Sequence, residues 1–169
     1  MSTIKLCTYT RGFYPTIWNY RIYTIFGIFL VIVDGKVVKR SYSETLFTKA
    51  AEIKVEFDAL KNGLEWIAGN YNTKTIDVQV LFCGANRVQC KKIADDNEEY
   101  PVHDMDIREL TKKFVKVSYY STTRVNEANL YDMANKIFEV LYGDSGFNHE
   151  VIQKYEEDGI QKQVLVGHP

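Results

Sequence analysis

The feature that most constrains the fold is an apolar strand that runs into a tight hairpin turn. Residues Thr24–Val33 (TIFGIFLVIV) are β-branched, aliphatic and aromatic, which predicts a buried central strand. Asp34 and Gly35 follow, and both residue types adopt the positive φ angles of a tight hairpin turn. Lys36–Ser43 then predicts the returning strand, and the alternating segment Ile4–Thr10 predicts a strand before the pair. We therefore expect three antiparallel strands at the start of the chain.

The hydrophobic period then changes to that of a helix over Thr48–Ala68. Apolar side chains recur at steps of three and four, which places them on one helical face: Ile53, Phe57, Leu60, Leu64 and Ile67. Thr48 is the expected N-cap, and Gly69 with Asn70 is the expected end.

The second half of the chain predicts strand–helix units. A strand is expected over Ile76–Cys83, and Gly84 then allows a turn into a helix of roughly ten residues. The remaining expected elements are a helix over Asp104–Phe114, a strand over Val115–Tyr120 and a helix over Asn126–Leu141. This β-β-β-α-β-α-α-β-α order predicts an α/β fold with a mixed five-stranded sheet and helices on both faces.

The length of 169 residues fits one well-buried domain. We expect it over residues 1–142. Residues 143–169 form a charged extension that packs on this domain or trails from it, with a short helix over His149–Asp158 and a strand over Gln163–Val166.

Composition limits the function classes. The net charge of −1 disfavours a protein that depends on non-specific phosphate contacts, so nucleic-acid binding requires a local basic patch or base stacking. Three cysteines without CxxC spacing indicate reduced thiols and a cytoplasmic protein, in the host cytoplasm if the gene is viral. The longest apolar run, Ile22–Val33, is too short to span a membrane, which needs about 20 residues.

Several segments resemble motifs of the ribonuclease-H-like superfamily, in its reverse-transcriptase-like group. Val55–Glu65 (VEFDALKNGLE) is similar to the family helix A-E-Y-x-A-L-x-x-G-L-E, and Val80–Gln89 (VLFCGANRVQ) is similar to V-x-G-D-S-x-x-V. Arg124–Asn135 (RVNEANLYDMAN) resembles R-x-x-N-x-x-A-D-x-L-A-N, and Tyr9–Gly12 stands where the family has Y-T-D-G. The resemblance covers about residues 4 to 141 and implies the element order given above.

The family's catalysis requires four carboxylates that hold two divalent metals about 4 Å apart. The resemblance carries these positions over as an incomplete set. Glu56 is kept, but the first-strand Asp falls on Arg11, and the Asp after the fourth strand falls on Ala85, or on Asn86 with a one-residue shift. The last-helix Asp falls on Tyr131, beside Asp132. Arg11 places a positive charge where metals would bind, and could instead pair with Glu56.

An aromatic and basic segment follows the first strand. Residues 9–23 (YTRGFYPTIWNYRIY) combine rings on which bases can stack with arginines that can contact phosphate. The same rings also suit a hydrophobic core or a protein interface. The candidate binding residues are Arg11, Tyr14, Trp18, Arg21, Asn86, Arg87 and Arg124.

Another basic group lies late in the chain. Arg108, Lys112, Lys113 and Lys116 fit either a solvated helix end or a surface that guides a phosphate backbone. His103, Asp104 and Asp106 fit a capped helix start better than a metal site.

These patterns lead to a functional hypothesis with open alternatives. The chain is expected to be a catalytically inactive ribonuclease-H-like domain that binds nucleic acid or a nucleotide in the former active-site cleft. A protein partner, such as a host factor of a virus or phage, is the other version, and a homo-oligomer is possible. No cofactor is expected, except Mg²⁺ or Mn²⁺ if the chain is instead a divergent nuclease that uses Glu56 and Asp132.

Overall fold

The computed structural model describes residues 2–13, 16–17, 20–21, 24–46, 52–96, 105–122, 130, 133, 135–136 and 160–162. Side chains are described for 2–13, 24–43, 52–96, 106–122, 130, 133, 135 and 136. The fold and the site are defined by these parts of the chain.

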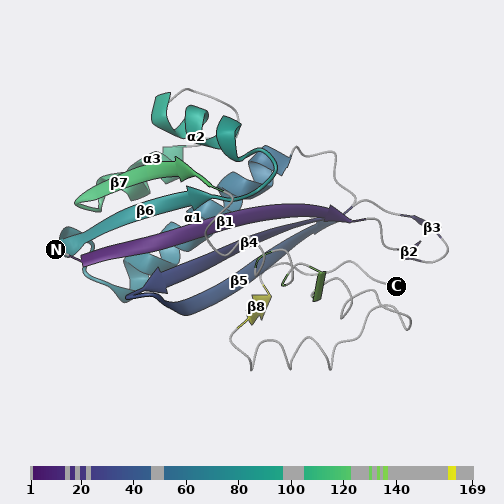
Figure 1. Cartoon of the computed structure of the whole chain (residues 1–169), viewed down its shortest axis with the longest axis horizontal. Helices are drawn as coiled ribbons and strands as arrows, with labels where there is room; N and C mark the ends of the chain where they lie inside the picture. Colours follow the sequence, from purple (N-terminus) through teal and green to yellow (C-terminus); the bar gives the residue numbers. More distant parts are fainter. Residues whose placement is uncertain are drawn as a thin grey trace.

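One six-stranded sheet forms the centre of the fold (Figure 1). Its strands are β1 (Ser2–Phe13), β4 (Thr24–Val33), β5 (Lys36–Leu46), β6 (Ile76–Phe82), β7 (Lys116–Ser121) and β8 (Ile160–Lys162). Their spatial order is β7-β6-β1-β4-β5-β8. β4 is antiparallel to both β1 and β5, whereas β6 is parallel to both β1 and β7, so the mixed five-stranded sheet expected from the sequence is confirmed.

Two features were not expected from the sequence. β8 pairs in parallel with β5 at Arg40–Tyr42 and adds a sixth strand from the C-terminal extension. The strand expected over Gln163–Val166 and the helix expected over His149–Asp158 lie outside the described residues. Two-residue strands, β2 (Thr16–Ile17) and β3 (Tyr20–Arg21), form a separate antiparallel pair between β1 and β4.

The hairpin turn has the predicted conformation. Asp34 has φ of 53° and Gly35 has φ of 78°, so both turn residues are left-handed. Turns of this kind match the twist of the flanking strands and fix their register. The turn therefore fixes how β4 and β5 pair along their whole length.

The described helices are α1 (Glu52–Asn70), α2 (Arg87–Asp96) and α3 (Met105–Lys112), with a 3₁₀ turn, η1, at Thr73–Thr75. At the end of α1 the Asn70 side-chain amide donates to the carbonyl of Trp66, 2.8 Å away, and satisfies one of the terminal carbonyls. The expected N-cap Thr48 lies outside the described residues. Of the last expected helix, Leu130, Met133, Asn135 and Lys136 are described, and they are helical.

Side chains on the two faces of the sheet form separate cores. The first core joins one face of β1, β4 and β6 to α1, α2 and α3, and it includes Leu6, Phe57, Leu64, Phe82, Cys90 and Ile107. The second core covers the other face and includes Cys7, Tyr9, Phe26, Tyr42, Leu130 and Met133. Because Leu130 and Met133 are helical, helical residues pack on both faces, as the sequence predicted. Among the described helices, none combines the length and apolar character needed to cross a membrane.

Candidate functional site around Glu56

Strand alternation decides which β1 side chains reach α1. Leu6 belongs to the first core with α1, whereas Cys7 and Tyr9 belong to the second core on the opposite face. Because successive strand residues point to opposite faces, Thr8 and Thr10 share the α1 face with Leu6. Both threonines are buried.

Glu56 projects from α1 onto these threonines. It is 0% exposed, and its Oε2 accepts a hydrogen bond of 2.9 Å from the Thr8 hydroxyl. Glu56 Oε1 and Thr10 Oγ1 are both buried without a hydrogen-bond partner among the described residues. Two polar atoms without partners in one place are unusual, because buried polar groups are nearly always hydrogen-bonded.

Burial changes the acidity of this carboxyl group. Desolvation raises the pKa of Glu56 to about 7, since a charged carboxylate is costly away from water. The Thr8 hydroxyl and the nearby backbone amides of Gly84 and Cys83 oppose the shift, and the charge of Glu52 adds to it. Glu56 therefore keeps its proton over much of the range in which a surface glutamate is charged.

The residue after β6 that lies against Glu56 is Gly84. A Cβ atom at Gly84 would lie 2.5 Å from Glu56 Oε1 and 3.2 Å from Thr10 Oγ1. The motif resemblance places the family's aspartate on Ala85 or Asn86, but Ala85 is exposed. The carboxyl group thus occupies the space that a side chain at position 84 would need.

Cys90 closes the site from α2. Its thiol is buried, and burial together with the neighbouring Glu56 raises its pKa well above the usual range. A neutral thiol beside a protonated carboxyl adds no charge to the site.

Arg11 lies on the other face of the sheet, which corrects the expectation from the sequence. Its partner in β4 is Phe26 of the second core, and its guanidinium lies 5.0 Å from the centre of the Phe13 ring. The anticipated Arg11–Glu56 pair is not formed, because the side chain that contacts Glu56 is Thr8. The short motif around Tyr9–Gly12 is displaced relative to the site, and strand parity decides the outcome.

Two other predicted residues lie close to the site at the start of α2. The Asn86 amide approaches Glu52 Oε2 at 3.5 Å, and Arg87 Nη1 donates to the carbonyl of Gly84 at 3.2 Å. Both side chains are half-buried. Arg21 lies in β3 without a described side chain, and the other predicted residues lie outside the described residues: Tyr14, Trp18, Arg124 and Asp132.

The sequence interpretation missed Thr8, Thr10 and Gly84. A signal was available, because Thr8 and Thr10 have the same strand parity as the apolar residues Ile4 and Leu6, which face α1. The motif resemblance pointed to Arg11 and outweighed this parity.

A divalent metal pair does not fit the described residues. Two-metal sites need several carboxylates around the ions. The described ranges bring together no group of three or more His, Cys, Asp or Glu side chains that could hold a metal ion. Thr8, Thr10 and Gly84 surround Glu56 with hydroxyls and backbone instead.

Comparisons with known proteins support the fold. No protein-family model and no curated protein matches the sequence. Among solved structures, the N-terminal RNase H domain of Rv2228c from Mycobacterium tuberculosis is 12% identical, with a TM-score of 0.53 over 81% of this chain and 99% of that chain.

Two further similar structures were solved with an RNA/DNA hybrid. LC11-RNase H1 is 14% identical, with a TM-score of 0.51 over 73% of this chain and 89% of that chain. The foamy viral protease–reverse transcriptase is 10% identical, with a TM-score of 0.51 over 80% of this chain and 19% of that chain. Together with the sheet order, these similarities show that the chain has the fold of the ribonuclease-H-like superfamily.

Proposed function

We propose that this chain is a ribonuclease-H-like domain that binds nucleic acid beside Glu56 and does not cleave it by two-metal hydrolysis. The observation that carries the proposal is the replacement of carboxylates by Thr8, Thr10 and Gly84 around the buried Glu56. The proposal keeps the binding role expected from the sequence and moves the altered positions to the residues that line the site.

The chemistry of the site supports binding without hydrolysis. In two-metal catalysis, ionised carboxylates hold the dications that activate water and stabilise the leaving oxygen. Glu56 has a pKa of about 7 and accepts a hydrogen bond from Thr8, so it is neutral in a large fraction of molecules at neutral pH. A neutral carboxyl group needs no metal to balance it and repels a nearby phosphate less than an ionised one does.

Cationic and amide side chains near the site support nucleic acid as the ligand. Arg87 is held against the carbonyl of Gly84, one residue beyond Cys83, and Asn86 lies next to it. Arginine and asparagine are common phosphate and sugar contacts in nucleic-acid complexes. Two of the similar structures contain an RNA/DNA hybrid, which makes a hybrid the first probe to test.

Fluorescence anisotropy with a labelled RNA/DNA hybrid, a DNA duplex and a single strand tests the proposal. We expect saturable binding of at least one probe at low salt, with affinity falling as salt rises. Arg87→Ala should weaken binding several-fold, whereas Lys36→Ala, in the exposed β4–β5 turn, should leave it unchanged. Flat titrations with all three probes at low salt would refute nucleic-acid binding.

A divergent metal-dependent nuclease is the second candidate. It is favoured by Glu52, whose carboxylate is close enough to raise the pKa of Glu56, and by Asp132 in the sequence of the last expected helix. Cleavage of the hybrid in millimolar Mn²⁺ distinguishes the two candidates. If wild-type protein cleaves, Glu56→Gln abolishes cleavage and the exposed control Glu65→Gln does not, the nuclease replaces the binding proposal.

A further inference from the structure

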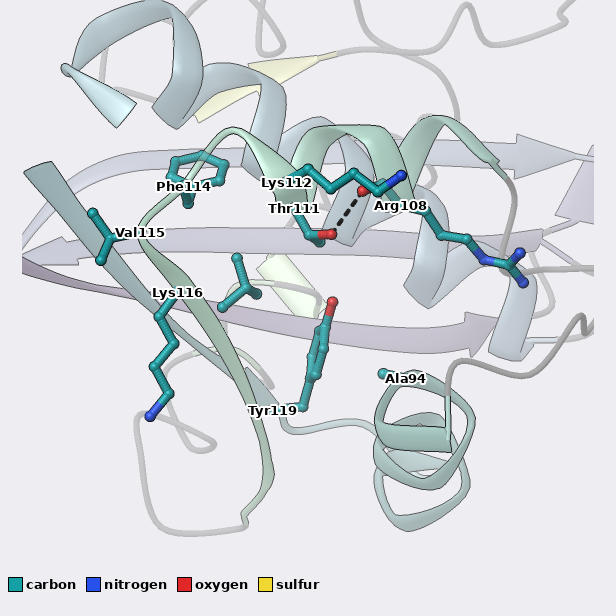
Figure 2. A pocket seen from close by; sticks show the side chains of 9 residues that line it. Ala94, Arg108, Thr111, Lys112, Phe114, Val115, Lys116 and Tyr119 are labelled. Atoms are coloured by element: carbon teal, nitrogen blue, oxygen red, sulfur yellow. Dashed lines mark hydrogen bonds between the residues drawn. The ribbon is translucent and has the colours of Figure 1, made fainter. Parts of the chain in front are cut away.

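A second concave surface lies at the β7 edge of the sheet, away from Glu56. It is an open hollow of roughly 380 Å³ between α3 and β7, with Ala94 of α2 at one side (Figure 2). Its polar lining residues are Arg108, Thr111, Lys112, Lys116 and Tyr119. The basic group noted in the sequence therefore contributes three of its four cations to one hollow.

The charge of the lining has a single sign. Arg108, Lys112 and Lys116 are cationic, and among the described residues no acidic side chain lines the hollow. Like charges that face one concave surface raise the local potential and attract an anion. In a chain of net charge −1, this hollow is a local concentration of positive charge.

The nearby carboxylates do not neutralise the hollow. Glu109 pairs with Lys112 at 3.0 Å, but both side chains are more than 60% exposed, and such surface pairs contribute little. Asp95 pairs with Lys91 in α2 and also lies close enough to raise the pKa of Tyr119. Neither Glu109 nor Asp95 lines the hollow.

Tyr119 adds a neutral donor in a fixed position. Its ring stacks on Phe82 with centres 5.9 Å apart and planes 11° apart, and Figure 2 shows its hydroxyl directed toward α3. Burial, followed by the charge of Asp95, raises the pKa of Tyr119 to about 12, so the hydroxyl keeps its proton at neutral pH. Thr111 uses its own hydroxyl to donate to the carbonyl of Arg108, 2.8 Å away.

The strand register separates this hollow from the Glu56 site. Lys116 is level with Asp77 at the start of β6, whereas Thr8 is level with Phe82 at its end. Five residues of parallel strand correspond to roughly 16 Å along the sheet. A ligand in the hollow therefore cannot be the group that contacts Glu56, but one extended polyanion could reach both.

We propose that the hollow formed by Arg108, Lys112, Lys116 and Tyr119 binds a phosphate group of a nucleic-acid backbone. Cations and hydroxyl donors are the usual partners of phosphate oxygens. The choice of a polynucleotide as the source of the phosphate rests on the proposed function above. The same chemistry would accept inorganic phosphate, so the test separates the two sources.

The first arm of the test uses inorganic phosphate and pyrophosphate with ¹⁵N-labelled full-length protein. We expect saturable chemical-shift changes at the backbone amides of Thr111, Lys116 and Tyr119. The changes should be lost in the double variant Lys112→Gln/Lys116→Gln and kept in the control Lys36→Gln, which lies in the exposed β4–β5 turn. Absence of these changes at millimolar pyrophosphate would overturn the anion site, whether or not the protein binds nucleic acid.

The second arm measures the salt dependence of polynucleotide binding. If the hollow binds the backbone, the double variant should lower the slope of log K against log salt by about one for each phosphate group that it no longer neutralises. Lys36→Gln should leave the slope unchanged. Pyrophosphate-induced shifts with an unaltered slope would overturn the backbone assignment, and flat titrations of wild-type protein would instead contradict the proposed function.

Discussion

The Thr8 hydroxyl donates a hydrogen bond of 2.9 Å to the Glu56 carboxyl, and both side chains are fully buried. This contact joins β1 to α1 at the point where the superfamily carries its catalytic carboxylates. It replaces an acidic cluster by a hydroxyl–carboxyl pair that is stable without metal. The chemistry of the whole site follows from that replacement.

Removal of the Thr8 hydroxyl should destabilise the fold and further raise the pKa of Glu56. Thr8→Val keeps the shape but deletes the donor, which leaves the carboxyl group with one partner fewer. Loss of a buried hydrogen bond of this kind costs about 1–3 kcal/mol. Chemical denaturation measures the cost, and a ¹³C NMR titration of the Glu56 carboxyl carbon measures the pKa. Thr8→Ser keeps the hydroxyl and should stay close to wild type in the pKa.

The same substitution two residues later should have the opposite outcome. Thr10 Oγ1 is buried without a hydrogen-bond partner among the described residues, so Thr10→Val removes a desolvated hydroxyl that gains little from the fold. We expect the free energy of unfolding to be unchanged or to rise, by up to about 1 kcal/mol. A loss as large as that of Thr8→Val would show that the Thr10 hydroxyl has a bound partner, such as an ordered water.

The stability of the protein should fall between pH 4.5 and about 7 because of Glu56. In this range the unfolded chain releases the proton at the ordinary pKa of 4.5, whereas the folded protein holds it up to about 7. Since the folded state binds more protons, the free energy of unfolding decreases as pH rises, by roughly 3 kcal/mol in total. The stabilising contribution is complete below pH 4.5 and lost above pH 7.

Glu56→Gln isolates this effect. The glutamine cannot ionise, so urea unfolding of the variant should show a flatter pH dependence than wild type, with less stability lost between pH 4.5 and pH 7. Glu65→Gln, on the exposed face of α1, should keep the wild-type profile. Parallel profiles for wild type and Glu56→Gln would contradict the raised pKa.

A side chain at position 84 should disrupt the site. In Gly84→Ala the new Cβ would lie 2.5 Å from Glu56 Oε1, so the buried carboxyl group must move away from Thr8. We expect a loss of about 1–3 kcal/mol. Gly69→Ala is the matched control, because a Cβ there meets nothing within 4 Å, and helix propensity then favours alanine by up to about 1 kcal/mol. Thermal unfolding of both variants checks the contrast.

Local sequence patterns were sufficient for the order of the elements. The apolar run Thr24–Val33 matches β4 in both of its bounds, and the Asp34–Gly35 turn has the expected left-handed backbone. The step of three and four between Ile53 and Ile67 predicted the buried face of α1. These features depend on residues close together in the chain, so periodicity and turn chemistry are enough to predict them.

The composition of the site depended on the tertiary structure. Motif similarity identified Glu56 but placed Arg11 beside it, whereas strand parity turns Arg11 to the opposite face and brings Thr8 to the carboxyl group. Likewise, only the position of the β6–α2 turn shows that Gly84, and not Ala85, lies against Glu56.

The sequence by itself therefore determined the β-β-β-α-β-α-α-β order and the one glutamate that the site retains. Only the tertiary structure decided which residues surround that glutamate, because a shift of one residue in a strand moves a side chain to the other face of the sheet. It also brought Lys112 of α3 and Lys116 of β7 to one hollow with Tyr119. Contacts of this kind depend on how the elements pack, which the local pattern of residues does not contain.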